Sequence, residues 1–317
     1  MTHAVSLGPR GSRLVAMDQS AFPGATVAFG ATVALLVAAA VGLPLSGSTA
    51  LLAACAAILV FGLPHGALDI ELIRRRGTSN HGLASILAVY LGIAAMTAVA
   101  WLIAPVAALF GFIVIAVVHF AEDWDAVRSR FLATGLAVAL IAAPAMLHRS
   151  EVAAIFVALT RAPAAARVAD GLLLVAPVAL AVAAVGILAM VAAHRFIAAA
   201  AAASLIALLA LPPVTGFAVF FCLFHSPRHF VGALLATQRW RVARWIPVVV
   251  PVTGAALAIV TGIYLLHGGL AVPQRLTAAT FMALSILTVP HMLAPALLRR
   301  LDARTSGGRA LRLRRRS

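Results

Sequence analysis

The sequence predicts an all-α integral membrane protein: a polytopic bundle of about ten transmembrane helices with both termini cytoplasmic. Of its 317 residues, 63% are hydrophobic and 10% are charged, and the mean hydropathy is +1.07. An ordinary soluble domain is about 45–50% apolar and about 25% charged. Moreover, the apolar residues form runs long enough to cross a hydrocarbon core about 30 Å thick. These observations exclude a soluble globular protein.

The first 22 residues are expected to form a short cytoplasmic tail. Met1–Ala21 contains Arg10 and Arg13 but no apolar core of the kind found in a signal peptide. The first apolar run, Ala25–Leu45, is longer than the apolar region of a signal peptide and long enough to span a membrane.

Hydropathy windows of about 19 residues predict the transmembrane helices. The shortest of the expected runs is Phe196–Leu211. The ten expected runs are Ala25–Leu45, Thr49–Asp69, Leu83–Ala104, Val106–Ala121, Phe131–Leu147, Leu172–Ala193, Phe196–Leu211, Val214–Leu235, Ile246–Leu266 and Leu276–Leu298.

The distribution of arginine between these runs indicates their orientation. With the N-terminus inside, 19 arginines lie on the cytoplasmic side and four lie outside, and Arg228 lies within a run. The net charge of +15 is therefore a topology signal and does not indicate nucleic-acid binding. We expect residues 23–298 to form a catalytic domain in the cell (inner) membrane. Residues 299–317 are expected to form a basic cytoplasmic tail, disordered after Arg304 and suited to anionic lipid headgroups.

Chemistry at membrane depth is indicated by ionisable side chains inside the apolar runs, because such groups are costly there. Five of the ten histidines lie within these runs, and all five are on spans expected to run from outside to inside. The candidate metal ligands are His65, His119, His225, His229 and His291.

Four of these histidines are expected in one layer. His65 and His119 each precede the next cytoplasmic arginine by nine residues, His229 by ten and His291 by eight. At about 1.5 Å per residue, this places them roughly 12–15 Å from the cytoplasmic helix ends. Four helices that bring imidazoles to one level are typical of a metal site in a helix bundle.

The spacing within the spans supports the same site. His225 and His229 are separated by four residues and share a helix face, as do His65 with Asp69 and His119 with Asp123. We expect Asp69 and Asp123 to accept the second ring proton of the neighbouring histidine, while direct metal ligation remains an alternative.

Further residues near the candidate ligands shape the expected pocket. Pro64, Pro227 and Pro290 lie within two residues of a candidate ligand and are expected to kink their helices. We expect Arg228 to pair with an acid such as Asp69 or Asp123. Aromatic residues are candidates to line a slot for an extended hydrocarbon: Phe61, Phe112, Phe120, Phe217, Phe220, Phe221, Phe224 and Phe230.

At these positions the sequence resembles the Brp/Blh family of bacterial beta-carotene 15,15'-dioxygenases. The resemblance rests on four motifs in order: Gly62-Leu63-Pro64-His65-Gly66-Ala67-Leu68-Asp69, Val118-His119-Phe120 with Asp123-Trp124, Phe224-His225-Ser226-Pro227-Arg228-His229 and Pro290-His291-Met292-Leu293. It implies a multi-pass dioxygenase with histidine-bound Fe(II) that uses O2 as co-substrate. His65, His119, His225 and His229 match the expected iron ligands, and His291 lies in a further shared motif.

The resemblance also implies a reaction and partners. The substrate would be beta-carotene or a related carotenoid, cleaved at its central double bond to two retinals, with a rhodopsin-type protein as an acceptor. The residues leave two alternatives. One is a histidine-cluster lipid desaturase or hydroxylase, which would need two irons and an electron donor; the other is a metal or proton transporter, which would need polar groups along a whole path across the bilayer.

Overall fold

The chain folds into a bundle of helices, as the sequence predicts. The computed structural model describes residues 23–68, 80–237 and 242–314, and every regular element within them is helical. The expected N-terminal tail and Asp69 lie outside the described residues. In order, the elements are α2 (Pro23–Ala40), α3 (Gly47–Ala57), η1 (Ile58–Gly62), η2 (Leu63–Leu68), α5 (Asn80–Ile103), α6 (Pro105–Ala121), η3 (Glu122–Trp124), α7 (Arg130–Thr160), η4 (Pro163–Ala165), α8 (Ala166–Ala210), α9 (Pro213–Phe220), η5 (Phe221–His225), α10 (Ser226–Thr237), α11 (Val242–Leu266) and α12 (Val272–Arg314).

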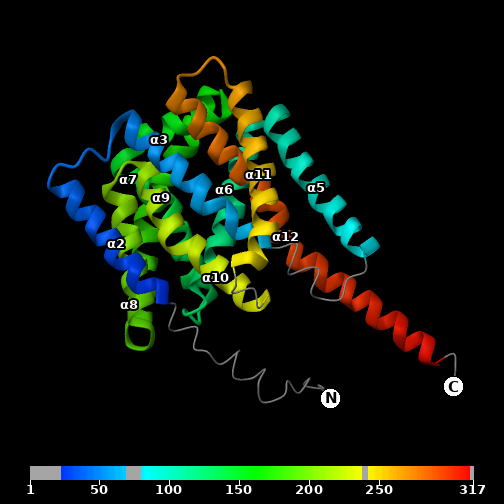
Figure 1. Ribbon diagram of the computed structural model, residues 1–317. Helices are drawn as coiled ribbons and strands as arrows, with labels where there is room; N and C mark the ends of the chain where they lie inside the picture. The colour runs from blue at the N-terminus through cyan, green and yellow to red at the C-terminus, as the bar shows by residue number, and fades with distance from the viewer. Residues whose placement is uncertain (1–22, 69–79, 238–241, 315–317) are drawn as a thin grey trace.

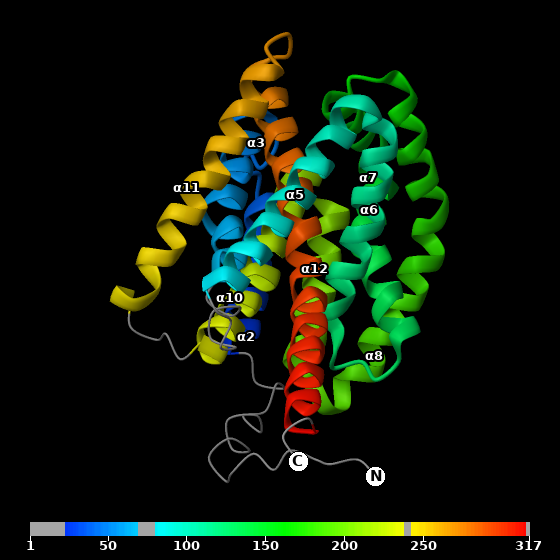
Figure 2. The same cartoon turned by 90° about the vertical axis from the view of Figure 1, so that its right-hand side faces the viewer.

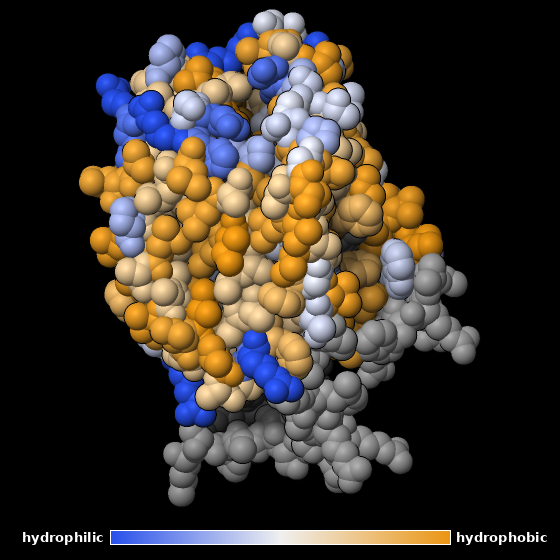
Figure 3. Space-filling model, turned by 90° about the vertical axis from the view of Figure 1, so that its left-hand side faces the viewer, coloured by the Kyte–Doolittle hydropathy of each residue, from blue (hydrophilic) through white to orange (hydrophobic). Residues whose placement is uncertain are grey.

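By length and composition, eight helices of the described residues could cross a membrane, and Ala25–Ala40 forms a shorter apolar helix. Large apolar side chains are exposed on the outside of the bundle, including Leu91, Met96, Leu174, Leu188 and Val250. Figure 3 shows hydrophobic residues across the middle of one face and hydrophilic residues at its ends. Such a surface is unfavourable in water and favourable in lipid. The chain is therefore a multi-helix membrane protein.

Helix α8 accounts for one difference from the ten expected runs. Its 45 residues would extend about 67 Å if straight, far more than one crossing needs. His194 interrupts it with non-helical backbone angles (φ −138°, ψ 48°), at the boundary between the expected runs Leu172–Ala193 and Phe196–Leu211. Ala158 lies before α8 and Pro212 after it, yet both line the same pocket. The beginning and the end of α8 are therefore close together, and its two limbs, before and after His194, run in opposite directions.

The last helix lies at the centre of the bundle. Helix α12 packs against α3, α5, α6, α7 and α11. Figures 1 and 2 show the bundle, and in Figure 2 α12 lies between α11 on one side and α6, α7 and α8 on the other. Its fully buried alanines Ala278, Ala279 and Ala283 let neighbouring backbones approach closely. Inside the bundle, the Trp101 Nε1–H donates a hydrogen bond to Ser285 Oγ over 3.0 Å.

The C-terminal segment differs from the expectation. Helix α12 continues to Arg314, so the prediction of disorder after Arg304 is wrong for the residues that the structure describes. Arginine, leucine and alanine are strong helix formers and here outweigh Gly307 and Gly308. In Figure 1, α2 begins and α12 ends at the same, lower end of the bundle.

Candidate metal centre

Helix α6 and the turn that follows it supply the first part of the site. His119 lies on the last turn of α6, and Asp123 and Trp124 lie in η3. All three side chains are buried; Asp123 and Trp124 have no exposed surface. A carboxylate buried so deeply must be balanced by hydrogen-bond donors or a cation.

The second part of the site comes from the continuous segment α9–η5–α10. Its middle, Phe221–His225, is a π-helix, and Pro227 follows it in α10. Proline lacks the N–H that a regular helix would need and crowds the preceding turn, so the wider π-turn forms there. Another π-helix, η1, ends at Gly62, two residues before Pro64. The expected distortions therefore occur at Pro64 and Pro227, whereas Pro290 lies within the continuous helix α12.

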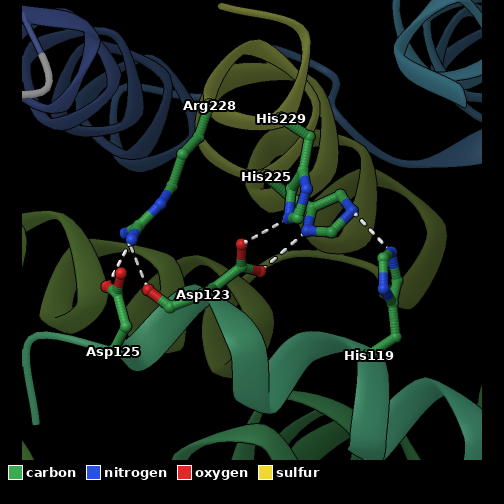
Figure 4. A network of polar contacts seen from close by, with 6 residues as sticks. All are labelled: His119, Asp123, Asp125, His225, Arg228 and His229. Carbon is green, nitrogen blue, oxygen red and sulfur yellow. Dashed lines mark hydrogen bonds and ion pairs between the residues drawn. The ribbon is translucent and has the colours of Figure 1, made fainter. Parts of the chain in front are cut away.

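Asp123 links the two parts. The His225 Nδ1–H donates to Asp123 Oδ2 over 2.7 Å, and the His229 Nε2–H donates to Asp123 Oδ1 over 3.0 Å (Figure 4). The expected partner was His119, one turn earlier on the same helix. This expectation fails because α6 ends at Ala121, and the 3₁₀ turn that follows does not keep the α-helical spacing.

Four imidazoles gather around this carboxylate. The Nε2 atoms of His119 and His225 lie 3.1 Å apart. The His229 ring centre is 4.5 Å from that of His225, and the His291 ring centre is 5.4 Å from that of His119. The structure therefore brings together His119, Asp123, His225, His229 and His291 from three separate parts of the chain.

The segment that carries His65 lies beside this group. A Cβ atom at Gly66 would lie 3.7 Å from His291 Nδ1, so the backbone of η2 passes close to the His291 ring. The side chain of His65 is outside the described residues. Of the seven predicted site residues, five side chains are thus seen in one cluster.

The donor atoms of this cluster fit a metal ion. Asp123, His225 and His229 each offer a ligand atom within 4.8 Å of one another. Two nitrogens that bind one ion at about 2.1 Å lie about 3 Å apart, close to the distance between the Nε2 atoms of His119 and His225. Imidazole and carboxylate donors suit iron, zinc, copper or nickel. The cluster could therefore hold a metal.

Arg228 lies between the two histidines of α10 in sequence and points away from them (Figure 4). Its guanidinium donates to the Asp125 carboxylate over 2.5 Å and to the backbone carbonyl of Asp123 over 2.7 Å. The expected pairing of Arg228 with an acid is confirmed, but the acid is Asp125 rather than Asp123, whose two carboxylate oxygens accept hydrogen bonds from histidines. Arg228 therefore fixes the η3 turn on which Asp123 is held.

An apolar pocket adjoins the cluster. Phe120 lines the pocket, and its ring centre is 5.0 Å from that of His225. Among the expected aromatic residues, Phe112, Phe120, Phe217 and Phe220 line this pocket. Phe61 is instead 64% exposed, Phe224 stacks on Trp124 and Phe230 packs against Trp245. Sequence reasoning missed Phe156 and Phe281, which also line the pocket but stand in no motif.

A third missed residue, Ser226, joins the two π-helices. The Ser226 hydroxyl donates to the backbone carbonyl of Phe61 over 2.6 Å. Its position between His225 and Pro227 was the available signal, because a small hydroxyl residue there can bond to a carbonyl that a distorted helix leaves open. This bond holds the π-helix of the His225 segment against that of the His65 segment.

Gly62 allows these two segments to touch, and replacing it should lower stability. A Cβ atom at Gly62 would overlap the Phe221 ring, which stacks on His225 with ring centres 5.1 Å apart. We expect Gly62→Ala to destabilise the protein by about 1–3 kcal/mol, as overpacking does. Gly111→Ala on α6 is the control, because a Cβ there meets open space. Thermal unfolding in detergent measures both; an unchanged Tm for Gly62→Ala would show that the close contact is unimportant.

Comparisons with known proteins agree with this site. The model of the family described as Beta-carotene 15,15'-dioxygenase matches residues 56–299, which include all the cluster residues. The chain is 28% identical over 261 residues to the beta-carotene 15,15'-dioxygenase of an uncultured marine bacterium, 66A03, covering 76% of this chain and 90% of the relative. It is 30% identical over 293 residues to the probable beta-carotene 15,15'-dioxygenase Blh of Halobacterium salinarum, covering 75% of this chain and 81% of the relative. No solved structure matches the chain significantly.

Proposed function

The chain belongs to the beta-carotene 15,15'-dioxygenase family, and we propose that it cleaves the central double bond of beta-carotene with O2 at a histidine-bound iron. The observation that carries this proposal is the contact between a buried imidazole cluster and a pocket lined only by apolar residues. A soluble polar substrate would find no partner in such a pocket, whereas a carotenoid would.

The proposed iron ligands are His65, His119, His225, His229 and His291. Asp123 is proposed as a positioning residue that accepts a hydrogen bond from Nδ1–H of His225. Because the ring proton is held on Nδ1, Nε2 of His225 carries no proton and stays turned toward His119. Asp69 is proposed to act in the same way on His65. When bound, iron supplies the activation of O2.

The apolar pocket is proposed to bind one half of the polyene. Along α6 its lining extends from Leu109 to Phe120, a distance of about 16 Å. This is comparable with half of an extended carotenoid, so a substrate that fills the pocket presents its central bond near the histidines. The fit of the pocket thus selects the bond that breaks.

The overall reaction balances without an electron donor. The central double bond breaks, and each of its two carbons receives one oxygen atom of O2, giving two retinal molecules. Both aldehydes are apolar enough to leave through the lipid, and a retinal-binding membrane protein is the proposed acceptor. We also propose that the lower end of Figure 1, where α2 begins and α12 ends, faces the cytoplasm at the inner membrane, as the arginine distribution predicts.

Expression in a bacterial host that accumulates beta-carotene tests the proposed function. We expect the cells to lose colour and their extracts to contain retinal. Retention of beta-carotene, with the protein detected in the membrane fraction and loaded with iron, would contradict the proposal.

Filling the apolar pocket should weaken cleavage without removing the metal. Ala116 lines the pocket and is 7% exposed, so Ala116→Trp places a large ring where the polyene is proposed to lie. We expect kcat/KM for beta-carotene to fall about 5- to 150-fold, which corresponds to a steric cost of about 1–3 kcal/mol, while the iron content stays unchanged. Ala95→Trp, on the exposed face of α5, is the matched control. Equal activities of the two variants would argue against this pocket.

A further inference from the structure

A second pocket lies where three membrane-spanning helices begin. It is formed by the first residues of α3, α9 and α12 and by the part of α7 that follows the break at His148, and its volume is about 310 Å³. None of the described histidines lines it. We call it the upper pocket, because α12 begins at the upper end of the bundle in Figure 1. Its polar lining residues are Ser46, Ser48, Glu151, Thr215, Gln274 and Thr277.

The upper pocket lies at the level of the lipid headgroups. The candidate membrane spans Gly47–Leu68, Pro213–Leu235 and Val272–Leu293 all begin at its wall. The headgroup regions flank the hydrocarbon core on both sides, so the ends of spanning helices meet the headgroups. Figure 3 likewise shows hydrophilic residues at the upper end of the face and hydrophobic residues below them.

The rest of the pocket wall is apolar. Ala154, Ile155 and Ala158 line the pocket from α7 and lie about one helical turn apart, so they share a helix face. Leu51 and Val214 line it from α3 and α9. A cavity with apolar walls and polar groups, placed at the headgroup level, fits a molecule that has an apolar part and a polar head. A membrane lipid is such a molecule.

Glu151 gives the pocket a negative charge. It is the only ionisable residue of the lining, and its side chain is 53% exposed. His148 Nδ1 lies 3.4 Å from one of its oxygens, which leaves lone pairs of the carboxylate for a further donor. The Thr215 hydroxyl donates its only proton to the backbone carbonyl of Leu45 over 3.3 Å, so it can only accept a hydrogen bond from a ligand. Both groups therefore favour a ligand with N–H donors and a positive charge.

Other groups of the pocket offer donors to an anion. Within the part of the chain that the structure describes, the exposed side chains of Ser46, Ser48 and Gln274 hold no hydrogen bond, and Ser46 does not cap α3 through its hydroxyl. The beginnings of the helices add a partial positive charge. A phosphate group fits these donors. Beside the carboxylate of Glu151, a phosphate that carries its own positive charge is favoured over a purely anionic one.

We propose that the upper pocket binds a zwitterionic phospholipid whose headgroup carries a primary ammonium group beside its phosphate, as in phosphatidylethanolamine. The ammonium group pairs with Glu151. The phosphate accepts hydrogen bonds from Ser46, Ser48 and Gln274, and the apolar walls contact the glycerol and the beginnings of the acyl chains. A lipid bound in this way bridges α3, α7, α9 and α12. The inference does not depend on the proposed function, because the lipid takes no part in the reaction.

Binding of two lipids to the purified, delipidated protein tests the inference. Phosphatidylethanolamine or phosphatidylglycerol with the same acyl chains is added in detergent, and native mass spectrometry gives each Kd. Phosphatidylglycerol has the phosphate but no ammonium group, so we expect it to bind more weakly. In Glu151→Gln the Kd of phosphatidylethanolamine should rise about two- to fivefold, the size expected for a half-exposed ion pair, and the preference between the two lipids should disappear.

Two matched controls locate the effect. Asp170→Asn removes the same charge from α8, where Asp170 pairs with Arg149 outside the pocket lining, and it should leave both Kd values unchanged. Gln274→Leu removes a donor to the phosphate and should weaken the binding of both lipids to a similar extent. Thr49→Val, next to Ser48 but not lining the pocket, should behave like the wild type.

Three results would overturn the inference. The first is equal binding of the two lipids by the wild type. The second is a preference for phosphatidylethanolamine that survives in Glu151→Gln. The third is binding of soluble phosphoethanolamine as tight as that of the lipid, because the apolar walls would then contribute nothing and the ligand would be a soluble ester. These measurements use neither iron nor carotenoid, so their failure would leave the proposed function standing.

Discussion

Replacing His225 by alanine is expected to abolish retinal formation. His225 has no exposed surface, and its Nε2 atom lies 3.1 Å from that of His119, so it stands at the centre of the imidazole cluster. Loss of a metal ligand removes several kcal/mol of transition-state stabilisation, and about 4 kcal/mol corresponds to about a thousandfold in rate. Retinal formation by purified protein, together with its iron content, measures the effect.

The matched control for this change is His194→Ala. His194 lies at the break in α8, outside the histidine cluster, so its loss should leave both iron content and cleavage close to those of the wild type. Activity in His225→Ala within tenfold of the wild type would show that the cluster is not the reaction centre.

The second large effect is expected from Asp123→Asn. The two carboxylate oxygens of Asp123 accept hydrogen bonds from His225 and His229. Asparagine offers only one acceptor oxygen and presents N–H donors on the other side. One of the two rings must then turn or change its tautomer. Loss of such a partner of a ligand histidine typically costs 10–100-fold in metal affinity. We therefore expect the iron Kd to rise by this factor, with activity partly restored by excess Fe(II).

Asp125→Asn is the control for the carboxylate. Asp125 is only two residues away and binds Arg228 instead of a histidine. Because its side chain is 46% exposed, loss of this ion pair should change stability by less than about 1 kcal/mol and leave the iron Kd unchanged. If the two variants bound iron equally well, Asp123 would have a merely structural role.

The grouping of the histidines was predictable from the sequence. Counting residues to the next cytoplasmic arginine placed His119, His229 and His291 at one depth, and the structure brings these rings together with His225. Depth can be counted because helices have a constant rise. The direction in which each ring points depends on helix rotation, which packing decides.

The partner of Asp123 shows where such counting fails. The spacing from His119 assumed a helix that continues past Ala121, but the chain changes there to a 3₁₀ turn. The carboxylate consequently meets the histidines of α10. Contacts of this kind, like the Ser226 bond to Phe61, join residues far apart in the sequence, so no local pattern reports them.

The limits of the helices were predictable only where a strong signal occurs. Pro105 and Pro213 stand at the beginnings of α6 and α9, as proline is favoured there. By contrast, His148 and His194 interrupt α7 and α8 although histidine is not a helix breaker. Helices α7 and α8 pack against each other, and no local sequence signal marks these two positions.

Measurement of iron together with activity in one purified preparation tests the central claim most directly. We expect about one iron per chain, loss of beta-carotene cleavage on removal of the metal by a chelator, and recovery in proportion to added Fe(II). Full cleavage by metal-free protein would contradict the account. Two irons per chain would also contradict it and would favour a di-iron lipid desaturase or hydroxylase.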